Sequence, residues 1–394
     1  MSRLSTIRLK PRQGKRVRAG APWVFSNEVE MTAQAKALAP GALVNVAGDD
    51  GREFGTGYFN PNSLIAVRLL DAKTDAAIDA AFFETKIRRA LVLRESIYER
   101  PFYRLVNAEG DLLPGLTIDR FDDALSVQIT TAGMEALRRP LLAALDAVLA
   151  PQVIILRGDA PSRALEGLKP AVETAKGRMS RVALEENGVR YFADLMGGQK
   201  TGWYFDQRDN RAFMASLARG KSVLDAYCYA GGFALACAAS GAREIVGLDS
   251  SAPALALAEE AAAANKTGAV TRFVKADVFE EFERLGEAGE RFDIVIADPP
   301  PFVKSRKDLE AGAKAYRKLA RLGARIVAPG GFLFLASCSH NIAPDRFALE
   351  SAAGIARAGR PARLIRQAGA GPDHPTHPML AESAYLKALV FGLD

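Results

Sequence analysis

From about residue 186 onward, the sequence alternates between short apolar runs and amphipathic or alanine-rich segments. This alternation predicts an α/β fold, a doubly wound parallel sheet that binds ligands at the carboxyl ends of its strands. Two later runs predict further strands, with an antiparallel edge among them. The predicted strands and helices are Ser222–Tyr227, Gly232–Ser240, Glu244–Leu248, Pro253–Lys266, Val270–Lys275, Phe279–Leu285, Phe292–Ala297, Asp308–Val327, Gly331–Ala336, Ala362–Gln367 and Tyr385–Phe391.

The residues before this region predict two smaller domains. Residues 1–70 carry short β-type runs, Leu43–Val46 and Leu64–Leu70, separated by glycine and Asn-Pro turns, and predict a small β-rich domain. Residues 71–185 predict a central α+β domain. The predicted division is therefore 1–70, 71–185 and 186–394. In the central domain we expect helices at Ala80–Arg94 and Glu135–Leu149, strands near Tyr103–Ala108 and Ala124–Ile129, and turn-rich stretches at Gly110–Gly115 and Gly167–Gly177.

Apolar content and cysteine usage exclude several classes of protein. No run approaches the roughly 18 apolar residues that a membrane span needs. The N-terminus has no apolar core segment and does not resemble a secretory signal. The three cysteines form no CxxC pair and the three histidines no zinc pattern. We therefore expect a cytoplasmic protein with no membrane partner and no metal.

Positive charge is concentrated at the N-terminus. The net charge is +6, and no acid occurs before Glu28. This clustering is typical of a surface that contacts a polyanion, although a frayed basic terminus would have the same composition. The bases of the first 18 residues are Arg3, Arg8, Lys10, Arg12, Lys15, Arg16 and Arg18.

Acidic residues end the first three predicted strands of the C-terminal region. The loop Asp225–Phe233 lacks the GxGxxG pattern that cradles a pyrophosphate, and contains only Gly231–Gly232. Asp249, 24 residues after Asp225, is suited to accept both ribose hydroxyls, and Asp277 to receive an adenine amino group. The combination predicts S-adenosylmethionine as the cofactor. The alternative is that these acids cap the following helices.

The fourth and fifth predicted strands end in chemistry-bearing motifs. D-P-P-P-F at Asp298–Phe302 forms a stiff loop, and S-C-S places Cys338 40 residues after Asp298. If the two strands are neighbours, Asp298 and Cys338 face one pocket. A thiolate that adds to a pyrimidine and a carboxyl group that stabilises the developing charge predict cytosine-5 methylation. The alternative is that Cys338 is a small buried strand residue.

These motifs resemble the family of bacterial large-subunit (23S) ribosomal RNA cytosine-5 methyltransferases, which join a PUA domain to a Rossmann-like catalytic domain. The resemblance covers nearly the whole chain, and its most specific part is G-Q-K-T-G-W-Y-F-D-Q-R-D-N-R at Gly198–Arg211. It implies an RNA-binding PUA domain at 1–70, a central domain and a methyltransferase domain at 186–394. It also implies a set of residues around the cofactor, with Arg208 near the methionine carboxylate. These residues, expected to help close the cofactor pocket, are Lys200, Thr201, Gln207 and Arg208. Tyr227 and Gly231 of the loop after the first strand are candidate cofactor contacts together with the three strand-end acids. Further matches are Pro22–Phe25, Gly57–Ser63 and Glu109–Leu116.

The sequence departs from the family pattern at Pro301, where the family usually has lysine or another residue. Two-cysteine RNA methyltransferases have a second cysteine there that assists enzyme release. The base that drives elimination is therefore unidentified, and the modified cytosine stays open.

Ribosomal RNA of the large subunit is the expected partner. The bases expected to contact RNA include two after the D-P-P loop, for which a solvated helix start is an equal alternative. These residues are Arg8, Lys10, Arg12, Lys15, Arg16, Lys304 and Arg306. Two other functions compete with cytosine-5 methylation: methylation of a base nitrogen, and a non-catalytic RNA-binding or ribosome-assembly role. The sequence leaves the oligomeric state open, a homodimer included.

Overall fold

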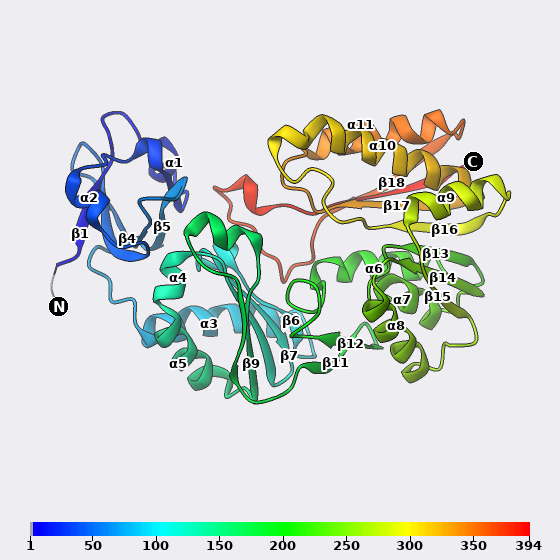
Figure 1. Cartoon of the computed structure of the whole chain (residues 1–394), viewed down its shortest axis with the longest axis horizontal. Coiled ribbons are helices and arrows are strands. Elements are labelled where there is room, and N and C mark those ends of the chain that lie inside the picture. Colours follow the sequence, from blue (N-terminus) through cyan, green and yellow to red (C-terminus); the bar gives the residue numbers. More distant parts are fainter. Residues whose placement is uncertain (1–2) are drawn as a thin grey trace. The chain divides into compact units, whose positions relative to one another are not determined.

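The computed structural model describes residues 3–394, and its contacts divide the chain into two compact units (Figure 1). The first unit runs from the N-terminus to Val182 and also contains Asp194–Trp203 and Pro372–Ser383. The second unit contains Ala183–Ala193, Tyr204–Gly371 and Ala384–Asp394. The division into three domains at 1–70, 71–185 and 186–394 stays a prediction. No helix of the described residues is long and apolar enough to cross a membrane.

The first unit begins with a five-stranded sheet in the order β1-β3-β4-β5-β2. β1 and β3 are parallel, and the other neighbours are antiparallel. Apolar side chains such as Val24, Val44 and Phe59 form its core, which confirms a β-rich N-terminal segment. The elements are β1 (Ser5–Arg8), α1 (Lys15–Arg18), β2 (Trp23–Phe25), η1 (Ser26–Glu28), α2 (Ala33–Ala37), β3 (Ala42–Ala47), β4 (Glu53–Phe59) and β5 (Ile65–Asp71).

A second five-stranded sheet of this unit has the order β10-β9-β8-β7-β6. Helices α3 and α5 pack together against it, and Asp79 caps α3 by accepting the Phe82 N–H. One expectation was wrong: most of the stretch from 167 to 177 is the exposed strand β10, whose polar composition concealed it. The elements are α3 (Ala80–Glu95), β6 (Phe102–Asn107), η2 (Ala108–Asp111), β7 (Leu116–Phe121), β8 (Ala124–Ile129), α4 (Ala132–Ala136), α5 (Arg138–Leu149), β9 (Val153–Gly158), η3 (Pro161–Glu166) and β10 (Ala171–Lys176).

A two-stranded sheet, β11 (Arg181–Glu186) and β12 (Val189–Asp194), follows. Its turn is Asn187–Gly188, with both residues at positive φ (53° and 77°). Asn-Gly is the pair that tight hairpin turns favour, because both residues tolerate the left-handed conformation.

The second unit contains a seven-stranded sheet in the order β15-β14-β13-β16-β17-β19-β18. The five strands β15, β14, β13, β16 and β17 are parallel to one another, whereas β19 is antiparallel to both β17 and β18. This topology confirms the doubly wound sheet and its antiparallel edge. The elements are η4 (Phe205–Gln207), α6 (Arg208–Ser216), β13 (Ser222–Ala226), α7 (Gly232–Ala239), β14 (Glu244–Asp249), α8 (Ala252–Ala264), β15 (Thr271–Lys275), α9 (Val278–Glu287), β16 (Phe292–Ala297), η5 (Arg306–Asp308), α10 (Leu309–Ile326), β17 (Val327–Ser337), α11 (Pro344–Arg357), β18 (Ala362–Ala368) and β19 (Lys387–Leu393); η6 (Ala381–Ser383) belongs to the first unit.

Two separate cores cover the two faces of this sheet. On one face, Leu333 and Leu335 of β17 pack with apolar residues of α9, α10 and α11. On the other face, Phe334 and Ala336 of the same strand pack with residues of α6 and α7. Strand side chains alternate between faces with a period of two, so each residue at a strand end can be assigned to one face.

Candidate active site

Four predicted site residues share one face of the seven-stranded sheet, at its carboxyl edge. Val223 and Ile296 belong to the core that packs against α6 and α7. Asp225 lies two residues after Val223, and Asp298 lies two residues after Ile296. Asp249 and Cys338 follow the same alternation from Ile245 and Ala336. β16 and β17 are adjacent, with Ala297 paired to Leu335, so the strands that carry Asp298 and Cys338 are neighbours. The predicted adjacency of these two strands is confirmed.

The serines on either side of Cys338 point to the opposite face. Ser337 Oγ donates to Tyr316 Oη of α10 (2.8 Å), and Ser339 Oγ lies 2.8 Å from the same hydroxyl. Since both serines are held on the α10 side, Cys338 between them projects toward α6 and α7. Cys338 is half-buried, whereas Cys228 and Cys237 are buried. The S-C-S motif thus orients the sulfur by anchoring its two neighbours.

The Asp298 carboxylate is held by a chain of side-chain amides. Gln207 Nε2 donates to Asp298 Oδ2 (2.9 Å), and Asn210 Nδ2 donates to Gln207 Oε1 (2.7 Å). Asn210 is held in turn by the Gly369 carbonyl (3.2 Å). Because Gln207 and Asn210 are buried, this chain fixes where the half-buried Asp298 carboxylate points.

Tyr204 links the Asp298–Cys338 pair to the cofactor loop. Burial raises the pKa of the Tyr204 phenol, and negative charge on Asp298 and Cys338 adds to the shift. Its ring packs edge-on against Tyr229 of the loop after β13, with centroids 5.4 Å apart. Asp298 and Cys338 therefore both lie within electrostatic reach of one aromatic side chain.

Lys387, at the start of β19, holds the turn that follows Cys338. Its Nζ donates to the carbonyls of Ser339 (2.6 Å) and Ile342 (3.2 Å). Burial lowers the pKa of Lys387 to about 8, while the attraction of Cys338 opposes that shift. A buried ammonium beside a thiol favours the thiolate.

The loop between β13 and α7 has an unusual backbone. Tyr227, Tyr229 and Gly231 all have positive φ (62°, 49° and 77°). A side chain at Gly231 would bring its Cβ to 3.0 Å from Ala258 Cβ. Left-handed non-glycine residues are costly and cluster at ligand-binding sites. The loop is also tied to β14, because the Tyr229 N–H donates to Asp249 Oδ2 (2.9 Å).

Carboxyl groups gather beneath this loop. Asp225 is buried and accepts the Ala234 N–H at the start of α7 (2.8 Å). Burial raises the pKa of Asp225 to about 8, and the charges of Asp298 and Asp249 add to the shift. A cluster of three acidic side chains, of which Asp225 and Asp249 are buried and Asp298 is half-buried, favours a cationic ligand, and the sulfonium of S-adenosylmethionine has that charge. The residues present therefore fit this cofactor.

Asp277 shows the alternative that the sequence left open. Its Oδ1 accepts the N–H groups of Phe279 (2.9 Å) and Glu280 (3.1 Å) and caps α9. Asp249 also accepts a backbone N–H, from Ser251 (2.8 Å). Capping of the following helix or turn therefore explains part of the role of both Asp277 and Asp249. Asp277 is exposed, and its contact with the cofactor stays a prediction.

The predicted cofactor residues of the segment 200–208 fall into different units. Lys200 and Thr201 belong to the first unit, where buried Thr201 donates its hydroxyl to Asp119. Arg208 is buried in the second unit, with Nε 3.5 Å from Glu186 Oε2. Their cofactor contacts stay predictions.

The predicted N-terminal RNA contacts are partly engaged within the chain. Arg16 forms an ion pair with Glu382 (2.9 Å), and Lys10 Nζ donates to the Asn27 carbonyl (2.9 Å). Arg8, Arg12 and Lys15 are exposed, as are Lys304 and Arg306 in the second unit.

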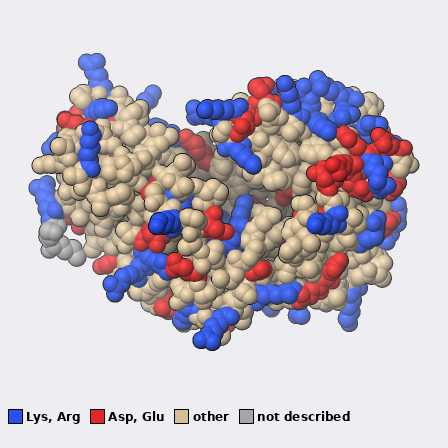
Figure 2. Space-filling view, viewed as in Figure 1, with Lys and Arg blue, Asp and Glu red and all other residues tan. Residues whose placement is uncertain are grey.

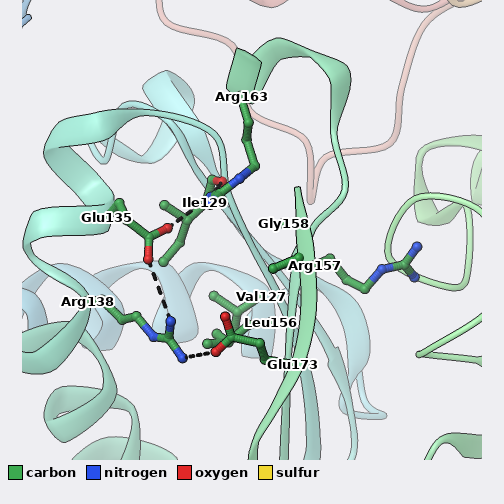
Figure 3. A pocket seen from close by; sticks show the side chains of 10 residues that line it. Val127, Ile129, Glu135, Arg138, Leu156, Arg157, Gly158, Arg163 and Glu173 are labelled. Carbon is green, nitrogen blue, oxygen red and sulfur yellow. Dashed lines mark hydrogen bonds and ion pairs between the residues drawn. The ribbon is translucent and has the colours of Figure 1, made fainter. Parts of the chain in front are cut away.

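A small pocket in the first unit is lined by Arg138, Arg157 and Arg163 (Figure 3). Their guanidinium groups are already paired with carboxylates and backbone carbonyls of the chain. Glu135 binds both Arg138 (3.6 Å) and Arg163 (2.9 Å). Arg157 points away and binds Asp159 (2.7 Å). Across residues 3–394, no three His, Cys, Asp or Glu side chains cluster so as to hold a metal ion. The expectation that the protein uses no metal stays a prediction.

Sequence reasoning missed Tyr204, Tyr316 and Lys387. The period-two alternation from Leu335 to Ser339 could have indicated that Cys338 and its flanking serines face opposite sides. No sequence signal pairs Lys387 with Cys338, because their contact depends on β19 lying beside β17.

Comparisons with known proteins agree with this geometry. A family described as S-adenosylmethionine-dependent methyltransferase matches residues 168–392, and a PUA-like domain family matches residues 7–72. Among solved structures, a SAM-dependent methyltransferase from Streptococcus mutans has a TM-score of 0.83 at 21% identity and covers 99% of this chain and 100% of its own. A methyltransferase crystallised with SAH has a TM-score of 0.85 at 22% identity, with the same coverage. At these identities, the two structures show the fold.

Curated relatives are more similar in sequence. "Ribosomal RNA large subunit methyltransferase I" from Shewanella denitrificans is 36% identical over 98% of both chains. Proteins of the same name from Shewanella amazonensis and Tolumonas auensis are 37% and 35% identical, again over 98% of both chains. The fold class, the PUA-like segment and the cofactor class expected from the sequence are confirmed. The chain belongs to the ribosomal RNA large subunit methyltransferase I family of S-adenosylmethionine-dependent methyltransferases.

Proposed function

We propose that this protein methylates carbon 5 of a cytosine in large-subunit (23S) ribosomal RNA. The observation that carries the proposal is that Asp298 and Cys338 directly follow two adjacent strands, β16 and β17, and continue the alternation that faces α6 and α7. The names of the relatives support ribosomal RNA as the substrate. A thiol and a carboxyl group in this arrangement support attack on a pyrimidine ring.

In the proposed reaction, the Cys338 thiolate adds to carbon 6 of the cytosine and forms a C–S bond. Asp298, oriented by Gln207, acts in its protonated form: it donates its proton to ring nitrogen 3, which neutralises the negative charge that develops during addition, and takes the proton back on elimination. Carbon 5 becomes nucleophilic as the electron pair moves to it. When bound, S-adenosylmethionine would supply the electrophilic methyl group: carbon 5 would gain the methyl as the methyl–sulfur bond breaks, which leaves S-adenosylhomocysteine. Loss of the carbon 5 proton to a base then breaks the C–S bond and frees Cys338.

The cofactor residues proposed for this reaction are those of the carboxylate cluster and its loop. Asp249 is suited to the ribose and Asp277 to the adenine, while Asp225 and the loop residues Tyr227 and Gly231 line the reactive end. Lys200, Thr201, Gln207 and Arg208 complete the proposed set. The exposed bases Arg8, Arg12 and Lys15 are proposed to contact RNA phosphates.

Phe302 argues against methylation of a base nitrogen. In that chemistry, an aromatic directly after the prolines faces the base, whereas here Pro301 intervenes. The half-buried Phe302 ring packs against Tyr316 (4.8 Å between centroids) and Phe279 (6.0 Å), at the edge of the core on the α10 side. This placement favours ring-carbon chemistry.

The test is methylation of an unmodified large-subunit ribosomal RNA transcript, with modified nucleosides identified by mass spectrometry. We expect 5-methylcytidine with the wild-type chain and none with Cys338→Ala, whose affinity for S-adenosylmethionine stays unchanged by calorimetry. RNA containing 5-fluorocytosine lacks the carbon 5 proton and should remain covalently bound to the wild-type chain only. A near wild-type rate for Cys338→Ala, or methylation of a nitrogen, would refute the proposal. Absence of cofactor binding to the wild-type chain would instead favour a non-catalytic role.

A further inference from the structure

The solvent-facing stripe of α10 is almost entirely basic. The helix buries Ala313, Tyr316, Leu319, Ala320 and other small or apolar residues against the sheet and α11. After Ala311, every residue on the solvent-facing side of α10 is basic, with the single exception of the half-buried Ala315. Lys314, Lys318 and Arg325 are exposed, and Arg317 and Arg321 are half-buried. The segment 304–325 contains eight bases and two acids, a net charge of +6 that equals the net charge of the whole chain.

Few carboxylates neutralise this stripe. Arg317 pairs with Glu350 (2.5 Å) and Lys318 with Glu283 (3.0 Å). Within the described range 3–394, Lys314, Arg321 and Arg325 form no ion pair. Figure 2 shows blue side chains gathered over α10 and α11, next to a red group over α9.

Helix stability does not explain the pattern. Like charges three and four residues apart on a helix repel each other, and the stripe contains several such pairs, for example Lys314 with Lys318 and Arg321 with Arg325. The helix dipole favours bases only in the last turn, which accounts for Arg325 but not for Lys314. A polyanion bound along the stripe would relieve this repulsion.

The neighbouring helix extends the same charge. A Cβ on Gly354 of α11 would lie 2.4 Å from the Arg317 carbonyl oxygen, so glycine lets the two helices approach closely. Three residues later, Arg357 ends α11 and is exposed.

The segment that leads into the stripe directly follows the D-P-P loop of the candidate active site. Lys304, Arg306 and Lys307 are exposed directly after the D-P-P loop, and α10 runs from there back along the sheet. The rise of an α-helix places Lys314 and Arg325 about 17 Å apart along the axis. We propose that the α10 stripe (Lys314, Arg317, Lys318, Arg321 and Arg325) binds the phosphate backbone of the RNA that flanks the target cytosine. This inference rests on the proposed function and adds to it a substrate contact away from the reacting groups.

The experiment measures binding of the full chain to an unmodified large-subunit ribosomal RNA transcript over a range of salt concentrations. The stripe variant combines Lys314→Gln, Arg321→Gln and Arg325→Gln. The control variant combines Arg219→Gln, Lys266→Gln and Arg272→Gln, which removes the same number of positive charges, three, from exposed positions elsewhere on the second unit. Each phosphate contact contributes about 0.7 to the log–log salt slope on single strands, so three lost contacts should reduce the slope by about 2 and weaken binding about 100-fold at 0.1 M salt. We expect the KM for RNA to rise while kcat at saturating RNA stays unchanged.

Equal salt slopes for the stripe and control variants would overturn the inference, and so would a fall in kcat without a change in KM. Binding to phosphatidylserine-rich vesicles is measured in parallel. If the stripe variant loses only vesicle binding and keeps the wild-type RNA slope, the inference is also overturned. Failure of the proposed function is distinguishable from these. If the wild-type chain binds RNA but forms no 5-methylcytidine, the proposed chemistry fails while the slopes still test the stripe.

Discussion

Replacing Asp225 by asparagine should stabilise the second unit at alkaline pH. Asparagine has the same shape, and its Oδ1 can still accept the Ala234 N–H. The substitution removes the carboxyl group whose pKa burial raises to about 8. Above the unfolded-state pKa of about 3.9, the unfolded chain ionises Asp225 while the native chain keeps its proton. The contribution of the Asp225 carboxyl group to the free energy of unfolding of the wild type is therefore fully present below about pH 3.9. This contribution is lost as the pH rises toward the native pKa of about 8.

The size of the effect follows from the shift. Each pH unit within this window costs about 1.4 kcal/mol, so the stability gap between Asp225→Asn and wild type should widen by about 3 to 4 kcal/mol from pH 5 to pH 8. Both tryptophans, Trp23 and Trp203, belong to the first unit, so their fluorescence would not report on the second. Hydrogen exchange of peptides from β13 and α7, corrected for intrinsic rates, gives the required opening free energy.

Asp345→Asn provides the control, because it removes an exposed carboxylate of the second unit. Its pH profile should follow that of the wild type. If the profiles of Asp225→Asn and wild type are parallel from pH 5 to pH 8, Asp225 is ionised in the native chain, and the argument from a crowded carboxylate cluster is wrong.

Three further predictions concern the surroundings of the site. Lys387→Met removes the ammonium beside Cys338, so the thiol pKa should rise and alkylation of Cys338 by iodoacetamide at pH 7 should slow roughly three- to tenfold; an unchanged rate would contradict the attraction between the two side chains. Glu186→Gln leaves the buried guanidinium groups of Arg208 and Arg211 without their carboxylate. The opening free energy of the second unit, measured by hydrogen exchange, should fall by about 3–5 kcal/mol. A loss under 1 kcal/mol would disprove a shared ion pair. Gly354→Ala forces a Cβ against a backbone carbonyl of α10 and should cost about 1–3 kcal/mol, whereas Gly268→Ala, which meets no atom within 4 Å, should cost less in the same assay.

Local patterns were sufficient for most of the second unit. Strands such as Phe292–Ala297 are near-continuous apolar runs, and helices such as α10 repeat their apolar residues with a period of 3.6, so each segment indicates its own structure. The polar strand β10 was missed because nearly all its side chains are exposed, and an exposed edge strand has no apolar period to detect.

The sequence by itself determined the element order of the second unit, the strand-end positions of Asp225, Asp249, Asp298 and Cys338, and the cofactor class. These depend on residues close together in the chain. Only the tertiary structure decided that Tyr316 anchors both serines around Cys338, and that Lys387 holds the turn after it. Those contacts join residues 21 to 48 positions apart, and they exist because β19 inserts antiparallel beside β17 and α10 packs over it, an arrangement that no local pattern encodes.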